Sequence, residues 1–565
     1  MSTTIGNVIT NIVGFSIVFY LLYLLGKFII KVFSPSTSSK KEFYKYPESA
    51  HKYALSLRAN DGGYININNP FRGIFVAGGA GSGKSESLIK PIILEAIHCD
   101  YCGILYDFKD PELSLYLYNA WNDKVDKRTQ FKRISFTDIE SSARCNPLAP
   151  RYLKTLSHAE EYATVIINNL VPESITKIDF WNRSAIALLQ SSIWFFKEHY
   201  PNECDLPHIV DFLQGSHHEV IKTLMKDATC KRLISSIVTA YEQQAEGQLA
   251  GTISTLQLAL NKINTPEIAY ILGKDDVNLD INNKENPTFL AIGNNPTIQD
   301  SISPVISLII TVSLRMMNTA NKHHSILILD EAPTLYIPKI EQVPATARSN
   351  KVSVVFCCQD LSQVIDRYGK GKKDILLSNL AYQFWGRVSH FETSNYMIQL
   401  AGKDDVWVES RSNSSSSSTN SDSTSNSTSQ SRQLRDNLRI QNIQSFAPGN
   451  FLCVLVERER RYLDRKFKRL SPSQLPNVFV ILFGTEYIEQ KINHFTREFS
   501  PDVYAFAEQV RNEVANILAH DLSFQNKTTN ELKQSEQKNR ELLSPVIDIG
   551  KFPDINTTID PDKYK

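Results

Sequence analysis

Residues 78–85 read Gly78-Gly79-Ala80-Gly81-Ser82-Gly83-Lys84-Ser85, a complete phosphate-binding loop of the form G-x-x-x-x-G-K-[ST]. The residues before the loop, 73–77, are apolar and partly β-branched, which is typical of a buried strand. The residues after it, 86–98, carry apolar side chains at helical spacing. Strand, loop and helix in this order predict a nucleotide site in which backbone N–H groups and the helix N-terminus bind phosphates.

The rest of such a site is made by side chains. We expect Lys84 to reach the β- and γ-phosphates and Ser85 to bind Mg²⁺. A second apolar strand, residues 325–329, ends in the carboxylates of Asp330 and Glu331. Asp330 is predicted to hold Mg²⁺, and Glu331 to orient or deprotonate the attacking water, which favours hydrolysis over storage of the nucleotide. The alternative is an apolar strand that happens to end in Asp-Glu, a common helix-start signal.

Composition excludes a global electrostatic attraction to nucleic acid or acidic lipid. The 565 residues include 61 Lys and Arg against 60 Asp and Glu, a net charge of +1. Any surface for such partners must therefore be local. The eight cysteines are scattered, and Cys99-x-x-Cys102 has no second pair at zinc spacing, so reduced thiols in a cytosolic region are expected.

The first residues have the composition of a membrane anchor. No charged residue occurs from position 1 to 26, and residues 5–30 are long enough to span a bilayer with room for tilt. Lysines at positions 27, 31, 40 and 41 follow the apolar run, so the side after it is expected to be cytoplasmic. A cleaved signal peptide is the alternative, disfavoured because a charged n-region and a small-residue cleavage site are missing.

The periodicity of the chain changes several times. In order, the predicted segments are a transmembrane anchor (1–33), a linker (34–50), the first part of a nucleotide-binding domain (51–151), an inserted all-α domain (152–276), the second part of the nucleotide-binding domain (277–470) and a partly disordered C-terminal extension (471–565). Strands that alternate with helices predict an α/β fold with a mostly parallel sheet covered on both faces. The Ser-rich stretch 410–432 cannot bury a core and is expected to be a flexible loop or a tail-like excursion.

Several short motifs accompany the two halves of the nucleotide site in a fixed order. They are Asp107-Phe-Lys-Asp110-Pro111, Phe180-Trp181, Gly251-Thr-Ile-Ser-Thr255 and Gln359-Asp-Leu-Ser-Gln363. In this order and spacing, residues 69–456 resemble the type IV secretion coupling proteins of conjugation, the TraG-like group in the FtsK/HerA branch of the RecA-type ATPases.

The resemblance implies a RecA-like P-loop core with an all-α insertion, assembled as a homo-hexamer that binds ATP and Mg²⁺ between subunits. Gln359 would sense the γ-phosphate, and Arg348 would be an arginine finger that reaches a neighbour's phosphate. The implied function is ATP-driven delivery of single- or double-stranded DNA, with its attached relaxase, to a type IV secretion channel. The protein would cross the bacterial inner membrane once. Many relatives carry two transmembrane helices, whereas a single apolar span is visible here.

Three alternatives remain open. A DNA segregation pump of the same superfamily predicts a terminal helical module that reads DNA, and none is visible. A nucleotide-dependent docking scaffold with slow hydrolysis predicts that Glu331→Gln leaves DNA transfer intact. A GTPase switch would use residues 176–179, Thr-Lys-Ile-Asp, to read guanine, but no clear strand precedes them.

Overall fold

The computed structural model describes residues 52–59, 64–175, 179–418, 421–456, 462–466 and 501–519. The predicted anchor at residues 5–30, the linker at 34–50, most of the C-terminal extension and most of the GTPase-like motif at 176–179 lie outside the described residues. The elements below belong to the unit Tyr53–Lys565.

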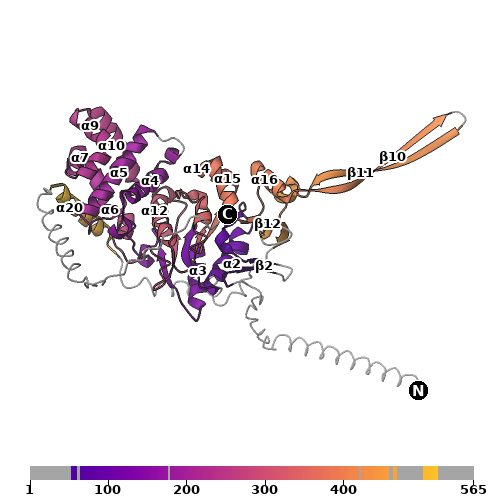
Figure 1. Ribbon diagram of the computed structural model, residues 1–565, viewed down its shortest axis with the longest axis horizontal. Coiled ribbons are helices and arrows are strands. Elements are labelled where there is room, and N and C mark those ends of the chain that lie inside the picture. The colour runs from indigo at the N-terminus through magenta and orange to yellow at the C-terminus, as the bar shows by residue number, and fades with distance from the viewer. Residues whose placement is uncertain are drawn as a thin grey trace, which may run out of the picture. The chain divides into compact units, whose positions relative to one another are not determined.

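A nine-stranded sheet organises the described chain (Figure 1). Its strands, in spatial order, are β13 (Tyr462–Lys466), β12 (Asn450–Val454), β9 (Tyr382–Trp385), β3 (Ile74–Ala77), β8 (Val352–Cys358), β7 (Ser325–Leu329), β4 (Cys102–Asp107), β6 (Thr288–Gly293) and β5 (Gln130–Ile134). The strands from β9 to β5 pair in parallel, and β12 is antiparallel to both β9 and β13. The predicted α/β class with a mostly parallel sheet is confirmed.

The central strands are buried along their whole length because helices flank the sheet. Strands β3, β8, β7, β4 and β6 contain only buried residues, as expected for a sheet covered on both faces. The helices that follow the strands are η2 (Ser85–Ile89), α2 (Lys90–His98), α3 (Glu112–Asp123), α12 (Gln299–Met317), α13 (Val343–Thr346), α14 (Leu361–Tyr368), α15 (Lys370–Asn379), α16 (Phe391–Ala401) and α17 (Ile440–Gln444). Because the strands are parallel, their carboxyl ends meet at one edge of the sheet, where the phosphate loop also lies.

One described helix, α12, is long and apolar enough to cross a membrane. It connects β6 to β7 and packs against α4 (Leu156–Leu170), and most of its side chains are buried within the protein. The apolar composition of α12 is therefore explained by its burial in the protein core.

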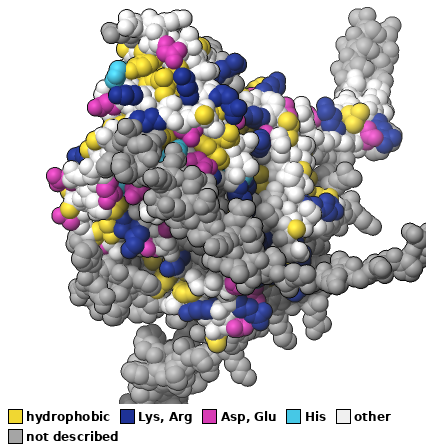
Figure 2. All heavy atoms as spheres, turned by 60° about the vertical axis from the view of Figure 1, so that its left-hand side comes forward, with side chains coloured by type: hydrophobic (Ala, Val, Ile, Leu, Met, Phe, Trp, Pro, Cys, Tyr) yellow, Lys and Arg dark blue, Asp and Glu magenta, His cyan; other side chains and the backbone are white. Residues whose placement is uncertain are grey.

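A helical region separates β5 from β6 in the chain and gathers beside the sheet in Figure 1. Its helices are α4, α5 (Phe180–His199), α6 (Leu206–Gln214), α7 (His217–Met225), α8 (Ala228–Leu233), α9 (Ser235–Glu242), α10 (Glu246–Asn261) and α11 (Pro266–Leu272). Figure 2 shows Lys and Arg side chains interspersed with acidic and hydrophobic ones on the visible face. That mixture agrees with the nearly zero net charge of the sequence.

The described part of the C-terminal extension is helix α20 (Val503–Ala519), which packs on α6 and α11. Val510, Val514 and Ile517 form its buried face. On α6, the imidazole of His208 lies between two carboxylates, with Nδ1 2.7 Å from Asp205 Oδ1 and Nε2 2.8 Å from Glu513 Oε2 of α20. The packing of α20 on α6 brings together His208 and Glu513, which are 305 positions apart in the chain.

In the described part of the chain, two hairpins lie outside the large sheet. Strands β1 (Leu55–Arg58) and β2 (Tyr64–Ile67) pair antiparallel. Strands β10 (Lys403–Ser418) and β11 (Ser421–Asp436) pair antiparallel over the Ser-rich stretch, which Figure 1 shows as a long ribbon. In the described residues the stretch expected to be a loop or excursion at 410–432 is a paired ribbon, in which backbone pairing between the strands satisfies N–H and C=O groups without a buried core.

Candidate nucleotide-binding site

The phosphate loop is held by backbone hydrogen bonds to three separate segments. Gly78 N donates to Cys358 O at the end of β8 (3.2 Å), and Gly79 N donates to Arg387 O beyond β9 (2.8 Å). Gly449 N, just before β12, donates to Ser82 O (2.8 Å). Neighbouring strands of the sheet therefore fix the shape of the loop.

Glycine is required at position 83 for two reasons. Gly83 has a φ of +85°, in the left-handed region that L side chains rarely adopt. A Cβ there would also lie 2.7 Å from Gly449 N, so a neighbouring backbone would have to move. The last glycine of the motif thus allows the close approach of residues that are far apart in the chain.

The two predicted halves of the site meet. Lys84 Nζ lies 3.0 Å from Glu331 Oε2 and also donates to Cys358 O at 3.2 Å. Lys84, Asp330 and Glu331 are all buried. Burial lowers the pKa of Lys84, but the charges of Glu331 and Asp330 outweigh it and raise that pKa overall. The ammonium and both carboxylates therefore converge in one place, as the sequence predicts.

Asp330 and Glu331 carry features of a site under functional constraint. Burial raises the pKa of Asp330 to about 6, against the opposing charge of Lys84. Glu331 adopts a φ of +55°, a left-handed conformation that stores strain in a non-glycine residue. Among the described residues, its buried Oε1 has no hydrogen-bond partner, and neither has Ser82 Oγ. Such oxygens suit a site that is completed by a polar ligand.

A cavity of about 450 Å³ opens over these groups. Its walls are Gly78, Gly79, Ala80, Gly81, Ser82, Gly83, Lys84, Ser85, Glu86, Ser87, Phe108, Lys109, Glu112, Leu113, Asp330, Glu331, Gln359 and Pro448. All eight residues of the predicted loop line it, together with the predicted Gln359, which follows β8 directly. The hydroxyl of Ser85 and the carboxylate of Asp330 are oxygen donors of the kind that Mg²⁺ prefers.

Arg348 lies elsewhere. It is exposed in the turn that precedes β8, at the amino end of that strand, whereas the cavity lies beyond the carboxyl end. It therefore contributes nothing to the site of its own chain. Its predicted contact with a neighbouring subunit stays a prediction.

Sequence reasoning missed two further residues of the site. Arg387 donates from Nη2 to Ala80 O at 3.1 Å, and Pro448 lines the cavity beside Gly449. Arg387 comes just after β9, so its place at the carboxyl end of a strand next to β3 explains its approach to the loop. No local sequence pattern marks Pro448, because it lies near the phosphate loop only through the antiparallel pairing of β12 with β9.

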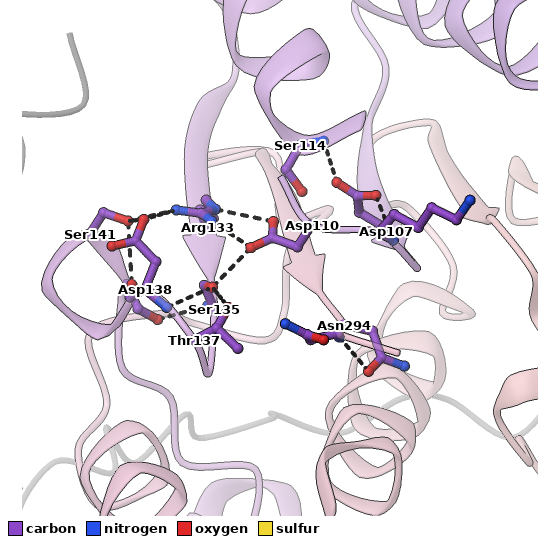
Figure 3. A network of polar contacts seen from close by, with 12 residues as sticks. Asp107, Asp110, Ser114, Arg133, Ser135, Thr137, Asp138, Ser141 and Asn294 are labelled. Carbon is purple, nitrogen blue, oxygen red and sulfur yellow. Dashed lines mark hydrogen bonds and ion pairs between the residues drawn. The ribbon is translucent and has the colours of Figure 1, made fainter. Parts of the chain in front are cut away.

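A polar network supports the wall of the cavity that follows β4 (Figure 3). Asp107 accepts hydrogen bonds from Leu113 N (2.9 Å) and Ser114 N (2.8 Å) at the start of α3, and burial raises its pKa to about 7. Asp110 pairs with Arg133 of β5 and accepts from Ser135 Oγ at 2.9 Å. The sequence motif at 107–111 is thus anchored on both sides.

Comparison with known proteins gives a family and a fold. A model of the family described as Type IV secretory system Conjugative DNA transfer matches residues 35–445. Comparison with curated proteins finds no match. The RecA-like core with a helical insertion has counterparts among solved structures.

Three of these solved structures are forms of a bacterial conjugative coupling protein. TrwBdeltaN70 in its unbound monoclinic form has a TM-score of 0.55 at 13% identity, covering 74% of this chain and 88% of that one. TrwB in complex with the non-hydrolysable ATP analogue ADPNP has a TM-score of 0.53 at 13% identity, covering 71% and 86%. TrwB in complex with ADP and Mg²⁺ has a TM-score of 0.50 at 14% identity, covering 73% and 89%. At these identities the likeness is one of fold.

Proposed function

The chain belongs to the type IV secretory system conjugative DNA transfer family, and from that premise we propose that it is an ATP-hydrolysing coupling protein that delivers DNA to a type IV secretion channel. One observation carries the proposal: Lys84 Nζ and Glu331 Oε2 lie 3.0 Å apart beside Asp330, in a cavity lined by the whole phosphate loop. Nucleotide binding by TrwB, whose fold is similar, supports ATP and Mg²⁺ as the ligands.

Each residue of the site has a distinct task in this proposal. The loop N–H groups and Lys84 bind the β- and γ-phosphates, and Ser85 and Asp330 would hold Mg²⁺, which supplies positive charge against the phosphates. Glu331 orients the attacking water and accepts its proton. Gln359, which follows the strand beside β7 and lines the cavity, would contact the γ-phosphate.

Binding of nucleotide phosphates in the cavity requires Lys84 to exchange its ion-pair partner Glu331 for phosphate oxygens. The Lys84 ammonium is bound to one oxygen of Glu331, Oε2, whereas the other oxygen, Oε1, has no hydrogen-bond partner among the described residues. Phosphate oxygens that take over Lys84 would release Oε2 as well, so that both oxygens of the carboxylate can face the attacking water.

The remaining features of the proposal rest on the family. We place the protein in the bacterial inner membrane with a single anchor at residues 5–30 and a cytoplasmic catalytic region. We also propose a homo-hexamer, in which the exposed Arg348 of one subunit reaches the cavity of the next. Its partners would be single- or double-stranded DNA, the attached relaxase and proteins of the secretion channel.

The test is ATPase activity of the detergent-solubilised full-length protein, with and without single- and double-stranded DNA. Glu331→Gln should keep binding of a non-hydrolysable ATP analogue and lower kcat by at least about 100-fold, since the base is lost. Glu219→Gln, at an exposed position on α7, is the matched control.

DNA transfer between cells completes the test. A motor requires that Glu331→Gln abolish transfer, whereas a docking scaffold with slow hydrolysis requires that transfer persist. Persistent transfer, together with an ATPase activity that DNA does not stimulate, would overturn the motor in favour of the scaffold.

A further inference from the structure

A second lysine lines the nucleotide cavity. Lys109 belongs to the segment that follows β4 and forms part of the same wall as Phe108, Glu112 and Leu113. Its side chain is exposed, and within the described part of the chain its ammonium makes no salt bridge. Lys109 therefore lines the same cavity as the carboxylate proposed to hold Mg²⁺.

The backbone around Lys109 is fixed on both sides. Lys109 N donates to Asp107 Oδ1 at 3.3 Å, and Glu112 N donates to Lys109 O at 3.0 Å. On the other side, Asp110 N donates to Asn294 O at 3.1 Å, and the Asp110 carboxylate is held by Arg133 and Ser135 (Figure 3).

The fit at Asp110 is tight. Its side chain is 2% exposed, and a Cβ at Gly293 would lie 2.4 Å from Asp110 Cγ. The network therefore fixes the backbone of the cavity wall to which Lys109 belongs.

The order of the strands in the sheet indicates which phosphate of a bound nucleotide lies nearest to Lys109. In the sheet, β3 with the phosphate loop is followed by β8, by β7 with Asp330 and then by β4 with Lys109. Asp330 therefore lies between the loop and Lys109. Phosphates bound by the loop point their terminal group towards Asp330 and Glu331, because those residues serve the metal and the attacking water. A cation beyond Asp330 approaches the terminal phosphate.

We propose that Lys109 is a second cationic contact of the triphosphate, specific for the terminal phosphate, so that the site binds ATP more tightly than ADP. This role rests on the proposed function of the cavity. The Asp107 and Asp110 carboxylates and Arg133 are its positioning residues, since they fix the backbone that carries it. The side chain itself touches the substrate and adds positive charge where the terminal phosphate is transferred.

The experiment compares two nucleotides in the full-length, detergent-solubilised protein with Mg²⁺. Dissociation constants are measured calorimetrically for ADPNP and for ADP. Lys109→Ala should weaken ADPNP binding by about 10- to 100-fold, the range of one hydrogen bond between charged groups, and change ADP binding by less than about twofold. Lys109→Arg should restore most of the ADPNP affinity.

The control is Lys132→Ala on β5, a half-buried lysine on the same sheet that does not line this cavity. Because Lys109 is exposed, its replacement should leave the melting temperature unchanged. Unaltered ADPNP affinity, or equal losses for both nucleotides, would overturn the role of Lys109 while the wild type still binds. Failure of the wild type to bind either nucleotide would instead overturn the proposed function.

Discussion

Replacement of Asp330 by asparagine should raise the free energy of unfolding of the nucleotide-free protein at neutral pH. It should also reduce the stabilisation that Mg²⁺ and nucleotide provide. Burial raises the pKa of Asp330 from its ordinary value of 3.8 to about 6. That difference corresponds to about 3 kcal/mol. Because the folded pKa lies above the unfolded one, the carboxyl favours folding only while it is protonated, and this contribution is lost as the pH rises from about 4 through about 6.

At pH 8 the ionised carboxylate therefore destabilises the fold. The amide of asparagine carries no charge but is still a buried polar group, so part of the desolvation penalty remains. We expect Asp330→Asn to raise the free energy of unfolding by about 1 to 3 kcal/mol at pH 8. The gain should shrink as the pH falls towards 4, where aspartate is protonated in the folded wild type.

The assay is unfolding of the full-length protein in detergent, without nucleotide, at pH values from 4 to 8. Asp366→Asn, at an exposed position on α14, makes the same chemical change away from the site and should alter stability by less than about 0.5 kcal/mol. A variant at position 330 that is no more stable than the wild type at pH 8 would refute the reasoning, because the carboxylate would then carry no burial penalty.

The same variant tests the proposed metal ligand. A ligand that binds only the folded state adds about 2.7 kcal/mol of stability when its concentration is one hundred times its dissociation constant. Mg²⁺ with ADPNP should stabilise the wild type in this way and Asp330→Asn much less, since one oxygen ligand of the metal is replaced by an amide. Equal stabilisation of both proteins would show that Asp330 does not hold the metal.

Three further predictions concern the loop and the C-terminal helix. Gly83→Ala should weaken ADPNP binding by at least about 10-fold, because its Cβ would lie 2.7 Å from the neighbouring backbone. The control Gly371→Ala, which has open space around its Cβ, should leave the affinity unchanged. Equal ADPNP affinities of the two variants would contradict this prediction. Arg387→Ala removes one hydrogen bond to the loop and should weaken ADPNP binding by about 2- to 10-fold, measured by calorimetry. Burial opposes the charging of His208, but Asp205 and Glu513 raise its pKa from 6.5 to about 9, so its stabilisation is complete below about 6.5 and is lost as the pH rises through about 9. His208→Ala should remove this decline in unfolding measurements and increase proteolysis of α20, and an unchanged pH profile would count against the contact.

The parts of the site that sequence predicts are those in which one local pattern fixes both chemistry and position. Residues 78–85 are such a pattern, and so is the apolar strand that ends in Asp330 and Glu331. Parallel strands bring their carboxyl ends to one edge, so two such patterns meet even with a helical region of many residues between them. Lys84 and Glu331 meet for this reason.

Other contacts have no local signal. Gly449 approaches Gly83 only because β12 returns antiparallel beside β9, and nothing near Gly449 in the sequence announces that turn. The pairing of β10 with β11 is a related case. A composition of Ser, Thr and Asn says that a segment cannot form a core, but it does not say whether its backbone is paired with another strand or with water.

On the proposed function, the contact between Lys84 and Glu331 links the entry of a nucleotide to the state of the proposed base. A buried ion pair that loses one partner leaves the other charge uncompensated, which is strongly unfavourable. Lys84 can therefore leave Glu331 only when another anion replaces it, and the terminal phosphates of a nucleotide are anions of the required charge. The released Glu331 carboxylate then lies beside the place where a water must attack, with the left-handed backbone at this residue holding it there. Entry of the phosphates would thus free the second oxygen of the proposed base, Oε2, in addition to the unpaired Oε1.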